Sequence, residues 1–326
     1  MRNNFWNRKN VLITGYEGFL GSYLAMSLLG FGAKVVGLDI KTHRKETILG
    51  EALRKIKIIK GSVEDYRLVS RIIKKKRIQF VFHLAATSIV GEAFSDPIKA
   101  FSTNIQGTWN ILESCRRSNA IEAVIVASSD KAYGMHNKLP YRENFSLCGS
   151  HPYDVSKSCA DLLAHTYFHT YGLPVSVTRC GNIFGPGDFN FSRLTPDAIC
   201  CALTGKALLI RSDGKFTRDY IYVDDIVNGY LLLAQNLKKL HLAGEAFNFS
   251  DENPISVIEL VKRVYKLAGK KENYKILNLA RFEIRHQYLD SAKARKMLNW
   301  KPEFALNEGL KTTIEWYRGL LELKKS

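Results

Sequence analysis

The chain has 326 residues, of which 46% are hydrophobic and 24% are charged, a balance that is ordinary for a soluble enzyme. This length can bury a large core, as one α/β unit or as two closely joined domains. The apolar runs are too short or too interrupted to span a bilayer, so we expect no transmembrane helix and no membrane partner. The first residues lead straight into a predicted strand without an apolar signal core, which favours a cytoplasmic protein.

The net charge of +17 at pH 7 is the one unusual feature of the composition. It is consistent with nucleic-acid binding, with attraction of an anionic substrate, or with lysine-rich faces in solvent. The densest basic run, residues 74–77, ends a predicted helix, where cations suit the helix dipole, and no aromatic residues alternate with it. We therefore expect no nucleic-acid partner. The six cysteines show no CxxC pair and no matching histidine spacing, so we also expect no metal site.

Short apolar strands alternate with longer helical patterns through the first half of the chain. The strands are predicted at residues 11–14, 34–39, 57–59, 80–84, 123–127 and 175–178, and the helices at 19–31, 64–76, 97–118 and 153–171. This alternation is typical of a parallel sheet covered by helices on both faces. We predict an α/β fold built on a doubly wound parallel Rossmann sheet.

After about residue 180 the alternation becomes less regular. Residues 218–225 read as a strand that opens a helix. Further helical patterns lie at 195–204, 256–268, 291–298 and 305–323. We predict a cofactor-binding domain over 1–180, a smaller mixed α/β substrate-binding domain over 181–326, and a segment, 217–240, that packs back on the first domain. We find no repeat and no Ser/Gly-rich linker, so we expect the two parts to pack as one body.

Three glycines follow the first predicted strand and open the first helix. Gly15, Gly18 and Gly21 let the backbone approach a pyrophosphate, whose charge then lies at the helix N-terminus. Asp39, at the end of the second strand, is placed to accept hydrogen bonds from a ribose diol. A carboxylate there repels a 2′-phosphate, so the expected cofactor is NAD rather than NADP.

A tyrosine and a lysine begin the helix predicted at 153–171. Because Tyr153 and Lys157 are four residues apart, they share one helix face, and the ammonium can lower the pKa of the phenol. A phenolate there can take the proton of a carbinol while hydride passes to nicotinamide. This motif occurs often by chance in helices. The glycine turn and the predicted strands before it favour a catalytic interpretation here.

The tripeptide Ser129-Asp130-Lys131 follows the fifth predicted strand, at the end where doubly wound sheets bind ligands. Ser129 can hydrogen-bond the same substrate oxygen as Tyr153. Elimination needs one group to take a carbon-bound proton and another to protonate the departing oxygen, and Asp130 and Lys131 can supply both. The alternative for these two charges is a solvated turn with an ion pair.

The chain resembles the extended short-chain dehydrogenase/reductase superfamily over nearly its whole length. Besides the features above, the resemblance rests on residues 83–86, 104–108, 218–223 and 298–302. It implies that NAD is the cofactor and that Lys157 also binds the nicotinamide ribose. His83, in an apolar strand, is interpreted as a core histidine with satisfied hydrogen bonds. Further cofactor contacts implied by the resemblance are Phe19, Leu20, Ser62, Val63, Leu84, Ala85, Ala86 and Asn104.

Within that superfamily, the tripeptide is similar to the Ser/Thr, acid and base of the nucleotide-sugar 4,6-dehydratases, and its Asp-Lys form to their CDP-glucose branch. The implied reaction oxidises C4 of a hexose, eliminates water across C5 and C6, and returns hydride to C6. Lys131 would be the base and Asp130 the acid. Ser129 in place of the commoner threonine, and the segment that begins at Arg218, depart from the CDP-glucose pattern, which leaves the nucleotide base open.

The expected partners are a nucleotide-diphosphate sugar and a second copy of the chain. The predicted helices 97–118 and 153–171 resemble those that pair in homodimers of this superfamily. The guanidinium of Arg218 suits a diphosphate, and Asn182 is expected to contact the sugar or its phosphate. Two arginines in polar loops, Arg193 and Arg281, are further candidates for substrate binding.

Other functions remain open at this point. A nucleotide-sugar 4-epimerase would use the same Tyr153, Lys157 and NAD and leave Asp130 and Lys131 idle. A decarboxylase of a nucleotide-linked uronic acid is a third enzyme of this kind. A non-catalytic protein that binds NAD is disfavoured by the intact Tyr153, Lys157 and Asp39.

Overall fold

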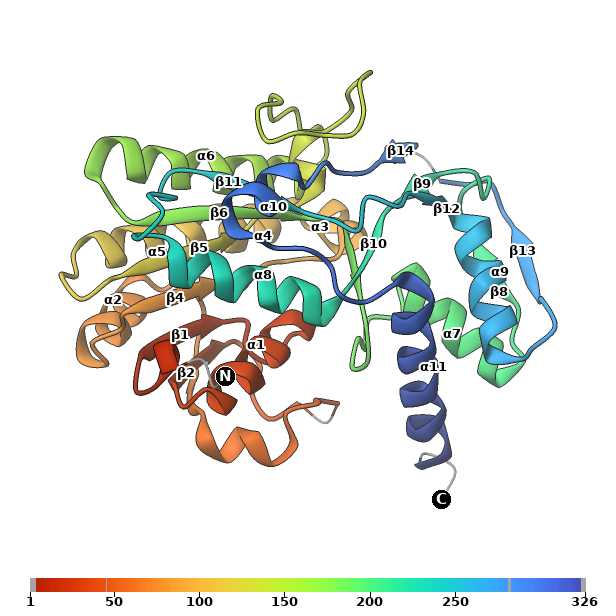
Figure 1. Cartoon of the computed structure of the whole chain (residues 1–326), viewed down its shortest axis with the longest axis horizontal. Coiled ribbons are helices and arrows are strands. Elements are labelled where there is room, and N and C mark those ends of the chain that lie inside the picture. Colours follow the sequence, from red (N-terminus) through yellow and green to blue (C-terminus); the bar gives the residue numbers. More distant parts are fainter. Residues whose placement is uncertain (1–3, 45, 281–282, 324–326) are drawn as a thin grey trace.

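The centre of the computed structural model, which describes residues 4–44, 46–280 and 283–323, is a parallel sheet of seven strands (Figure 1). In spatial order they are β11 (Ala246–Phe249), β6 (Val175–Cys180), β5 (Ala123–Ala127), β4 (Phe80–His83), β1 (Asn10–Thr14), β2 (Lys34–Asp39) and β3 (Lys57–Lys60). The order reverses at β1, so the helical crossovers cover both faces. The predicted doubly wound α/β fold is confirmed.

Alternate residues of each strand belong to two different cores. Ile125 of β5 packs with the first core, which contains α1 (Phe19–Gly30) and α8 (Val223–Asn236). Val124 packs with the second core, beneath α2 (Tyr66–Lys75), α5 (Gly107–Arg116) and α6 (Pro152–Tyr171). Burial on both faces explains why β5 is a continuous apolar run in the sequence.

The helix predicted at 97–118 is interrupted. It consists of α4 (Pro97–Phe101), the π-helical segment η3 (Ser102–Gln106) and α5, and a short helix, α3 (Val90–Ser95), precedes it. The remaining short helical segments are η1 (Asn4–Trp6), η2 (Gly50–Lys55) and η4 (Asp130–Tyr133). Single π turns inside helices often mark functional positions, and this one contains Asn104.

The seventh strand, β11, was not predicted from the sequence. It pairs in parallel with β6 and lies beside α10 (Ala292–Leu298), which comes from the last part of the chain (Figure 1). Trp300 follows α10, is buried in the first core, and its Nε1 donates to the Asp225 carbonyl oxygen at 2.9 Å. Late segments of the chain therefore complete the sheet and its first core.

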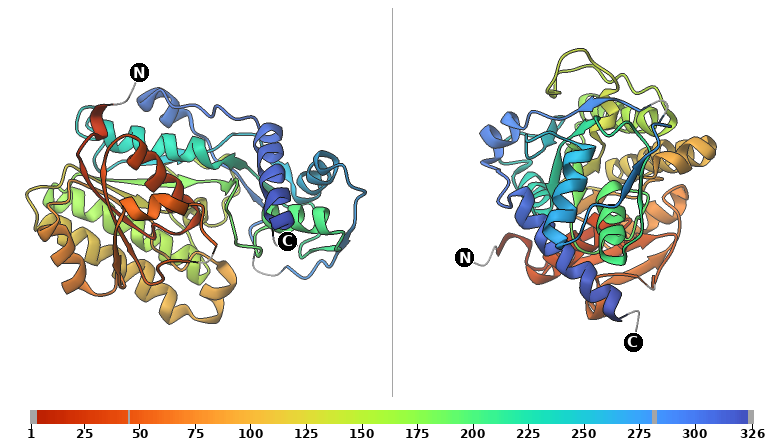
Figure 2. Two further views of the ribbon diagram at one scale, coloured as in Figure 1. Left: turned by 90° about the horizontal axis from the view of Figure 1, so that it is seen from below. Right: turned by 90° about the vertical axis from the view of Figure 1, so that its right-hand side faces the viewer.

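A smaller group of elements lies beyond the carboxyl ends of the strands (Figure 2). Ile199, Leu260 and Leu310 contribute to its separate hydrophobic core. Its helices are α7 (Leu194–Thr204), α9 (Val257–Ala268) and α11 (Leu306–Leu323). Its short strands are β7 (Asn182–Phe184), β8 (Leu208–Ile210), β9 (Thr217–Arg218), β10 (Tyr220–Tyr222), β12 (Ile255–Ser256), β13 (Tyr274–Ile276) and β14 (His286–Gln287).

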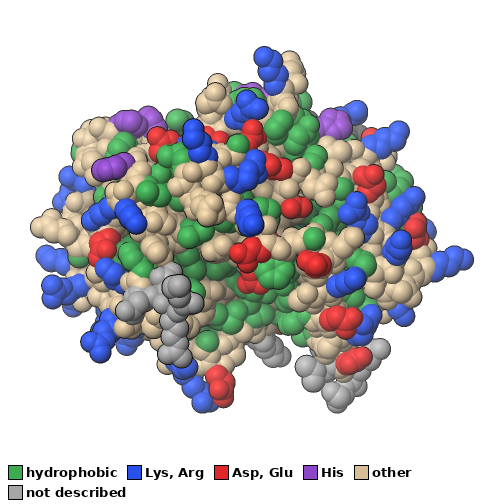
Figure 3. Space-filling view, viewed as in Figure 1, with side chains coloured by type: hydrophobic (Ala, Val, Ile, Leu, Met, Phe, Trp, Pro, Cys, Tyr) green, Lys and Arg blue, Asp and Glu red, His purple; other side chains and the backbone are tan. Residues whose placement is uncertain are grey.

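Lysine and arginine side chains lie scattered over the face shown in Figure 3, with acidic and apolar side chains between them. On this face the positive charge belongs to separate solvated side chains and not to one continuous track. Among the described helices, none has the length and apolar character needed to cross a membrane.

Candidate functional site

The glycine turn lies between β1 and α1, where close backbone contacts leave no room for side chains. Gly15 has a φ of +71°, and a Cβ atom there would lie 3.0 Å from the Ala85 nitrogen. A Cβ atom on Gly21 would overlap the Gly15 carbonyl oxygen. Gly18 is the N-cap of α1, whose first turn contains no acidic side chain. This clear, tightly folded turn at a helix N-terminus fits the pyrophosphate of a dinucleotide.

Asp39 is buried at the end of β2, beside the glycine turn. Its Oδ1 accepts a hydrogen bond from the backbone N–H of Lys41 at 3.1 Å, and the Arg44 guanidinium lies 3.3 Å away. Glu17, inside the glycine turn, accepts hydrogen bonds from the backbone N–H groups of His43 and Arg44. Glu17 and Arg44 thus hold the loop after β2 against the glycine turn. No sequence pattern indicated these two residues.

Thr14 and His83 link the ends of β1 and β4. The Thr14 Oγ1 accepts hydrogen bonds from the backbone N–H groups of Leu84 and Ala85, both at 3.1 Å. His83 Nδ1 lies 2.8 Å from the Thr14 hydroxyl, and Nε2 lies 3.1 Å from the Thr108 hydroxyl. Burial lowers the pKa of His83 to about 3, so the ring is neutral. His83 therefore has the structural role expected for it.

Asn104 uses its amide within the protein. Its Oδ1 accepts from the Thr87 N–H at 2.8 Å, and its Nδ2 donates to the Thr87 carbonyl at 3.2 Å and to the Ser156 hydroxyl at 2.8 Å. These bonds hold the segment after β4, which begins with Leu84, Ala85 and Ala86, against α6. Asn104 thus holds the segment after β4 in place, and its predicted contact with the cofactor stays a prediction.

Ser62 and Val63 follow β3 and lie against the helix that contains Asn104. The Ser62 hydroxyl accepts from the Glu64 N–H at 3.1 Å, and Asn110 Nδ2 donates to the Val63 carbonyl at 3.0 Å. The ring of Phe19, in the first turn of α1, contacts Tyr23 edge to face, and Phe19 and Leu20 are only partly buried. These segments surround the end of the sheet near the glycine turn.

The predicted catalytic side chains meet where β5 ends and α6 begins. Ser129 is the N-cap of η4, and its hydroxyl accepts from the Lys131 N–H at 3.2 Å and donates to Asp130 Oδ1 at 3.1 Å. Burial raises the pKa of Tyr153 to about 12, and a side-chain hydrogen bond with Ser129 opposes the increase. The tripeptide and Tyr153 thus form one hydrogen-bonded group.

Lys157 lies beneath Tyr153, with only 6% of its surface exposed. Its Nζ donates to the Ala127 carbonyl at 2.7 Å and lies 6.0 Å from the centre of the Tyr153 ring. Burial lowers the pKa of Lys157 to about 8. The spacing of Tyr153 and Lys157 predicts that the lysine makes the phenol more acidic. In the structure the pKa of Tyr153 is raised instead, because burial of the phenol is the dominant effect.

Asp130 is 6% exposed, and its carboxyl is less acidic than usual. Burial raises the pKa of Asp130, and the charges of Lys131 and Arg218 oppose that shift. Asp219, which no sequence pattern singled out, is fully buried nearby; burial and the charge of Asp130 raise its pKa to about 7. Lys131 Nζ donates to Gln287 Oε1 at 3.4 Å, a second contact that sequence reasoning missed. An acid with a raised pKa, Asp130, therefore lies near Tyr153, and the amine of Lys131 lies near that acid.

The predicted substrate-binding residues differ in their surroundings. The Arg218 guanidinium donates to the backbone carbonyls of residues 217, 284 and 285, and its charge acts on Asp130. Arg193 donates to Asp188 at 3.0 Å, and its charge acts on Tyr153. Asn182 Nδ2 donates to the Asp219 carbonyl at 3.2 Å. These three thus border the catalytic group, whereas Arg281 lies outside the described residues.

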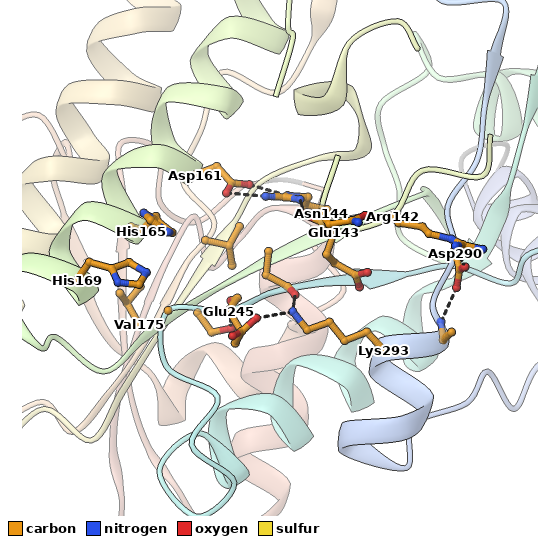
Figure 4. A pocket seen from close by; sticks show the side chains of 17 residues that line it. Arg142, Glu143, Asn144, Asp161, His165, His169, Val175, Glu245, Asp290 and Lys293 are labelled. Atoms are coloured by element: carbon orange, nitrogen blue, oxygen red, sulfur yellow. Dashed lines mark hydrogen bonds and ion pairs between the residues drawn. The ribbon is translucent and has the colours of Figure 1, made fainter. Parts of the chain in front are cut away.

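A cavity of about 720 Å³ lies apart from this group, between α6, β6 and β11 (Figure 4). Of the predicted site residues that the structure describes, none lines it. Arg179 binds both carboxylate oxygens of Asp161 at 2.8 Å and donates to the Tyr133 hydroxyl at 2.8 Å. A second ion pair joins Lys293 to Glu245 at 2.6 Å. The charged side chains that line the cavity are thus largely paired with one another. The Arg179–Asp161 ion pair also supports η4, because Arg179 bonds Tyr133 at the end of that segment.

Comparisons with known proteins agree with the fold and show the family. Residues 12–313 match the family described as GDP-mannose 4,6 dehydratase. The chain is 30% identical to CDP-glucose 4,6-dehydratase of Salmonella typhimurium, over 97% of this chain and 92% of that protein. It is 31% identical to UDP-glucuronate 4-epimerase of Thermodesulfobacterium geofontis, over 97% of this chain and 98% of that protein.

The fold also matches solved structures. dTDP-glucose 4,6-dehydratase of Streptomyces venezuelae, solved with NAD bound, aligns with a TM-score of 0.88 and 26% identity, over 96% of this chain and 98% of that one. The relatives include dehydratases and epimerases, so the comparisons leave the two reactions unseparated. The resemblance drawn from the motifs is confirmed. The chain belongs to the GDP-mannose 4,6 dehydratase family, among the nucleotide-sugar dehydratases and epimerases.

Proposed function

We propose that the chain is an NAD-dependent 4,6-dehydratase that converts a CDP-glucose-like nucleotide hexose into the 4-keto-6-deoxy sugar. One observation carries the proposal: the charge of Asp130 and a hydrogen bond with Ser129 both act on Tyr153, and the charge of Lys131 acts on Asp130, at the carboxyl end of β5. Tyr153 and Lys157 serve both a dehydratase and an epimerase. An acid beside a base is needed only for elimination.

Each protein group has one task in this reaction. NAD, when bound, accepts hydride from C4 and returns it to C6. Tyr153 takes the proton of the C4 hydroxyl, which also hydrogen-bonds Ser129, and Lys157 binds the ribose of the cofactor. The C4 ketone acidifies the C5 hydrogen, which Lys131 removes as a proton. Asp130 protonates the C6 oxygen, which leaves as water, and the ammonium of Lys131 returns a proton to C5 when hydride reaches C6.

The surroundings of Asp130 suit this task. An acid that must deliver a proton near neutral pH needs a pKa above that of an exposed aspartate. Burial raises the pKa of Asp130. In substrate binding, the charges of Arg218 and Arg193 suit the diphosphate.

A panel of nucleotide hexoses tests this function. Incubation of the protein and NAD with CDP-, dTDP-, UDP- and GDP-glucose and GDP-mannose should give, for at least one of them, a product lighter by one water. Mass spectrometry of the nucleotide sugars is the measurement. A product of unchanged mass, formed without any loss of water from the whole panel, would contradict the dehydratase.

The second candidate is a 4-epimerase, which the 31% identity to a UDP-glucuronate 4-epimerase favours. Adding UDP-glucuronate to the panel separates the two reactions, because an epimerase would return an isomer of the same mass. Chromatography that resolves the 4-epimers identifies that product. Release of carbon dioxide from UDP-glucuronate would instead mark a decarboxylase.

We also propose that the chain forms a homodimer through α4, α5 and α6. Ile98, Trp109 and Leu162, one from each helix, are 78%, 43% and 57% exposed. Large apolar side chains grouped on neighbouring helices are typical of a protein interface. Pairing these faces would cover them and surround the start of α6, which carries Tyr153.

Glutamate at Trp109 and Leu162 together should convert the dimer to a monomer, because it places charges in the apolar interface. Size-exclusion chromatography with light scattering should give twice the mass of one chain for the wild type and the mass of one chain for this double variant. Leu209→Glu, at a 52% exposed position in β8, is the control and should stay dimeric. A monomeric wild type would contradict the proposal.

A further inference from the structure

The backbone of the smaller group of elements holds Gln287 beside the catalytic tripeptide. Gln287 lies in β14, which pairs with β9 so that Gln287 is opposite Arg218. The Arg218 guanidinium donates to the carbonyls of Ile284 and Arg285, immediately before this strand. The strand ladder and the arginine therefore fix the position of Gln287 independently of its own side chain.

The side chain of Gln287 is completely buried and only half satisfied. Its Oε1 accepts a hydrogen bond from Lys131 Nζ at 3.4 Å. Its Nε2 is buried as well, and among the described residues it has no hydrogen-bond partner. Buried amide donors are nearly always paired, so the burial of this amide beside Lys131 has a cost in hydrogen bonding.

We propose that Gln287 is a positioning residue whose amide oxygen directs Lys131 at C5. The inference rests on the proposed dehydratase function. Because Lys131 must reach C5, the group that its Nζ contacts decides where the amine lies.

The neutral charge of Gln287 matters as much as its position. An amide oxygen fixes the direction of the Lys131 amine without forming an ion pair. A carboxylate of the same shape would hold Lys131 as the ammonium and prevent it from taking a proton from C5. Gln287→Glu therefore separates a positioning role from mere packing.

The test compares Gln287→Glu and Gln287→Met with the wild type. The control is His286→Glu, which adds the same charge one residue away in β14 on an exposed side chain. Two rates are measured with the nucleotide hexose that the wild type converts: reduction of bound NAD, followed by absorbance, and loss of water, followed by mass.

We expect reduction of bound NAD within about threefold of the wild type in every variant, because Tyr153 and Lys157 are unchanged. Gln287→Glu should slow water loss about 100-fold and move its pH–rate profile about one pH unit higher. Gln287→Met should slow water loss about tenfold without moving the profile. Equal slowing of both rates, or an unmoved profile in Gln287→Glu, would overturn the proposal.

A titration of Lys131 makes the result independent of the reaction. Lysines are dimethylated with ¹³C, and the Lys131 signal is assigned by its disappearance in Lys131→Arg. Its midpoint should rise by about one pH unit in Gln287→Glu and stay unchanged in His286→Glu. Equal titration midpoints of Lys131 in Gln287→Glu and His286→Glu would contradict the contact between Gln287 and Lys131, even if the enzyme is a dehydratase. If the wild type only isomerises its substrate, the dehydratase proposal fails, while the titration still decides the contact.

Discussion

Asparagine at Asp130 should slow loss of water about 1,000-fold while oxidation at C4 stays within about tenfold of the wild type. The amide keeps the shape of the carboxyl but cannot protonate the C6 oxygen. Oxidation proceeds through Tyr153 and Lys157, so reduced cofactor should accumulate in the variant. Absorbance of the reduced cofactor and the mass of the nucleotide sugar measure the two steps separately.

The base is identified by exchange of the C5 hydrogen. In deuterated water, Asp130→Asn should still exchange that hydrogen, because Lys131 remains to remove it, whereas Lys131→Met should lose both exchange and elimination. Lys138→Met, which removes an exposed lysine from the loop after η4, is the control and should behave as the wild type. Normal water loss in Asp130→Asn would make the tripeptide an ordinary charged turn and favour the epimerase.

Most of the sheet could be predicted from the sequence, because its strands carry a strong local signal. β5 is a run of apolar residues buried on both faces, and such runs are visible without any tertiary information. β11 was missed because it has only four residues, one of them the polar Asn248. The amide of Asn248 donates to the carbonyls of Tyr141 and Asp290, distant partners that the sequence does not reveal.

The candidate site also has a part that local sequence patterns predict and a part that they do not. Ser129, Asp130 and Lys131 are adjacent in sequence, and Tyr153 and Lys157 are one helical turn apart, so local patterns could bring them together. Gln287 reaches Lys131 across 156 positions of the chain, through the pairing of β14 with β9. No spacing rule predicts such a contact. It depends on how the late segments fold back onto the sheet.

Local patterns also could not give the sign of the pKa shifts. The spacing of Tyr153 and Lys157 showed that they share a face, and charge alone then favours an acidic phenol. Burial was not visible in the spacing. It raises the pKa of Tyr153 to about 12 and lowers that of Lys157 to about 8, since both groups are charged less readily away from water.

Phenylalanine at Tyr153 should slow oxidation at C4 about 1,000-fold in either a dehydratase or an epimerase, because both need the phenol to take the C4 hydroxyl proton. Loss of water should fall equally, since elimination follows the ketone. Reduction of bound NAD in a single turnover is the measurement. Tyr171→Phe, at the far end of α6 on a 55% exposed side chain, is the matched control and should keep the wild-type rate.

The pH dependence of this step follows from the two pKa shifts. With the pKa of Tyr153 raised to about 12, the phenolate fraction, and with it the rate of C4 oxidation, should increase with pH across the neutral range. Above about pH 8, Lys157 loses its proton and no longer stabilises the phenolate, so the increase should flatten there. Tyr153→Phe should show no such rise. A variant that kept the wild-type rate and profile would remove Tyr153 from the chemistry and leave the site without its C4 base.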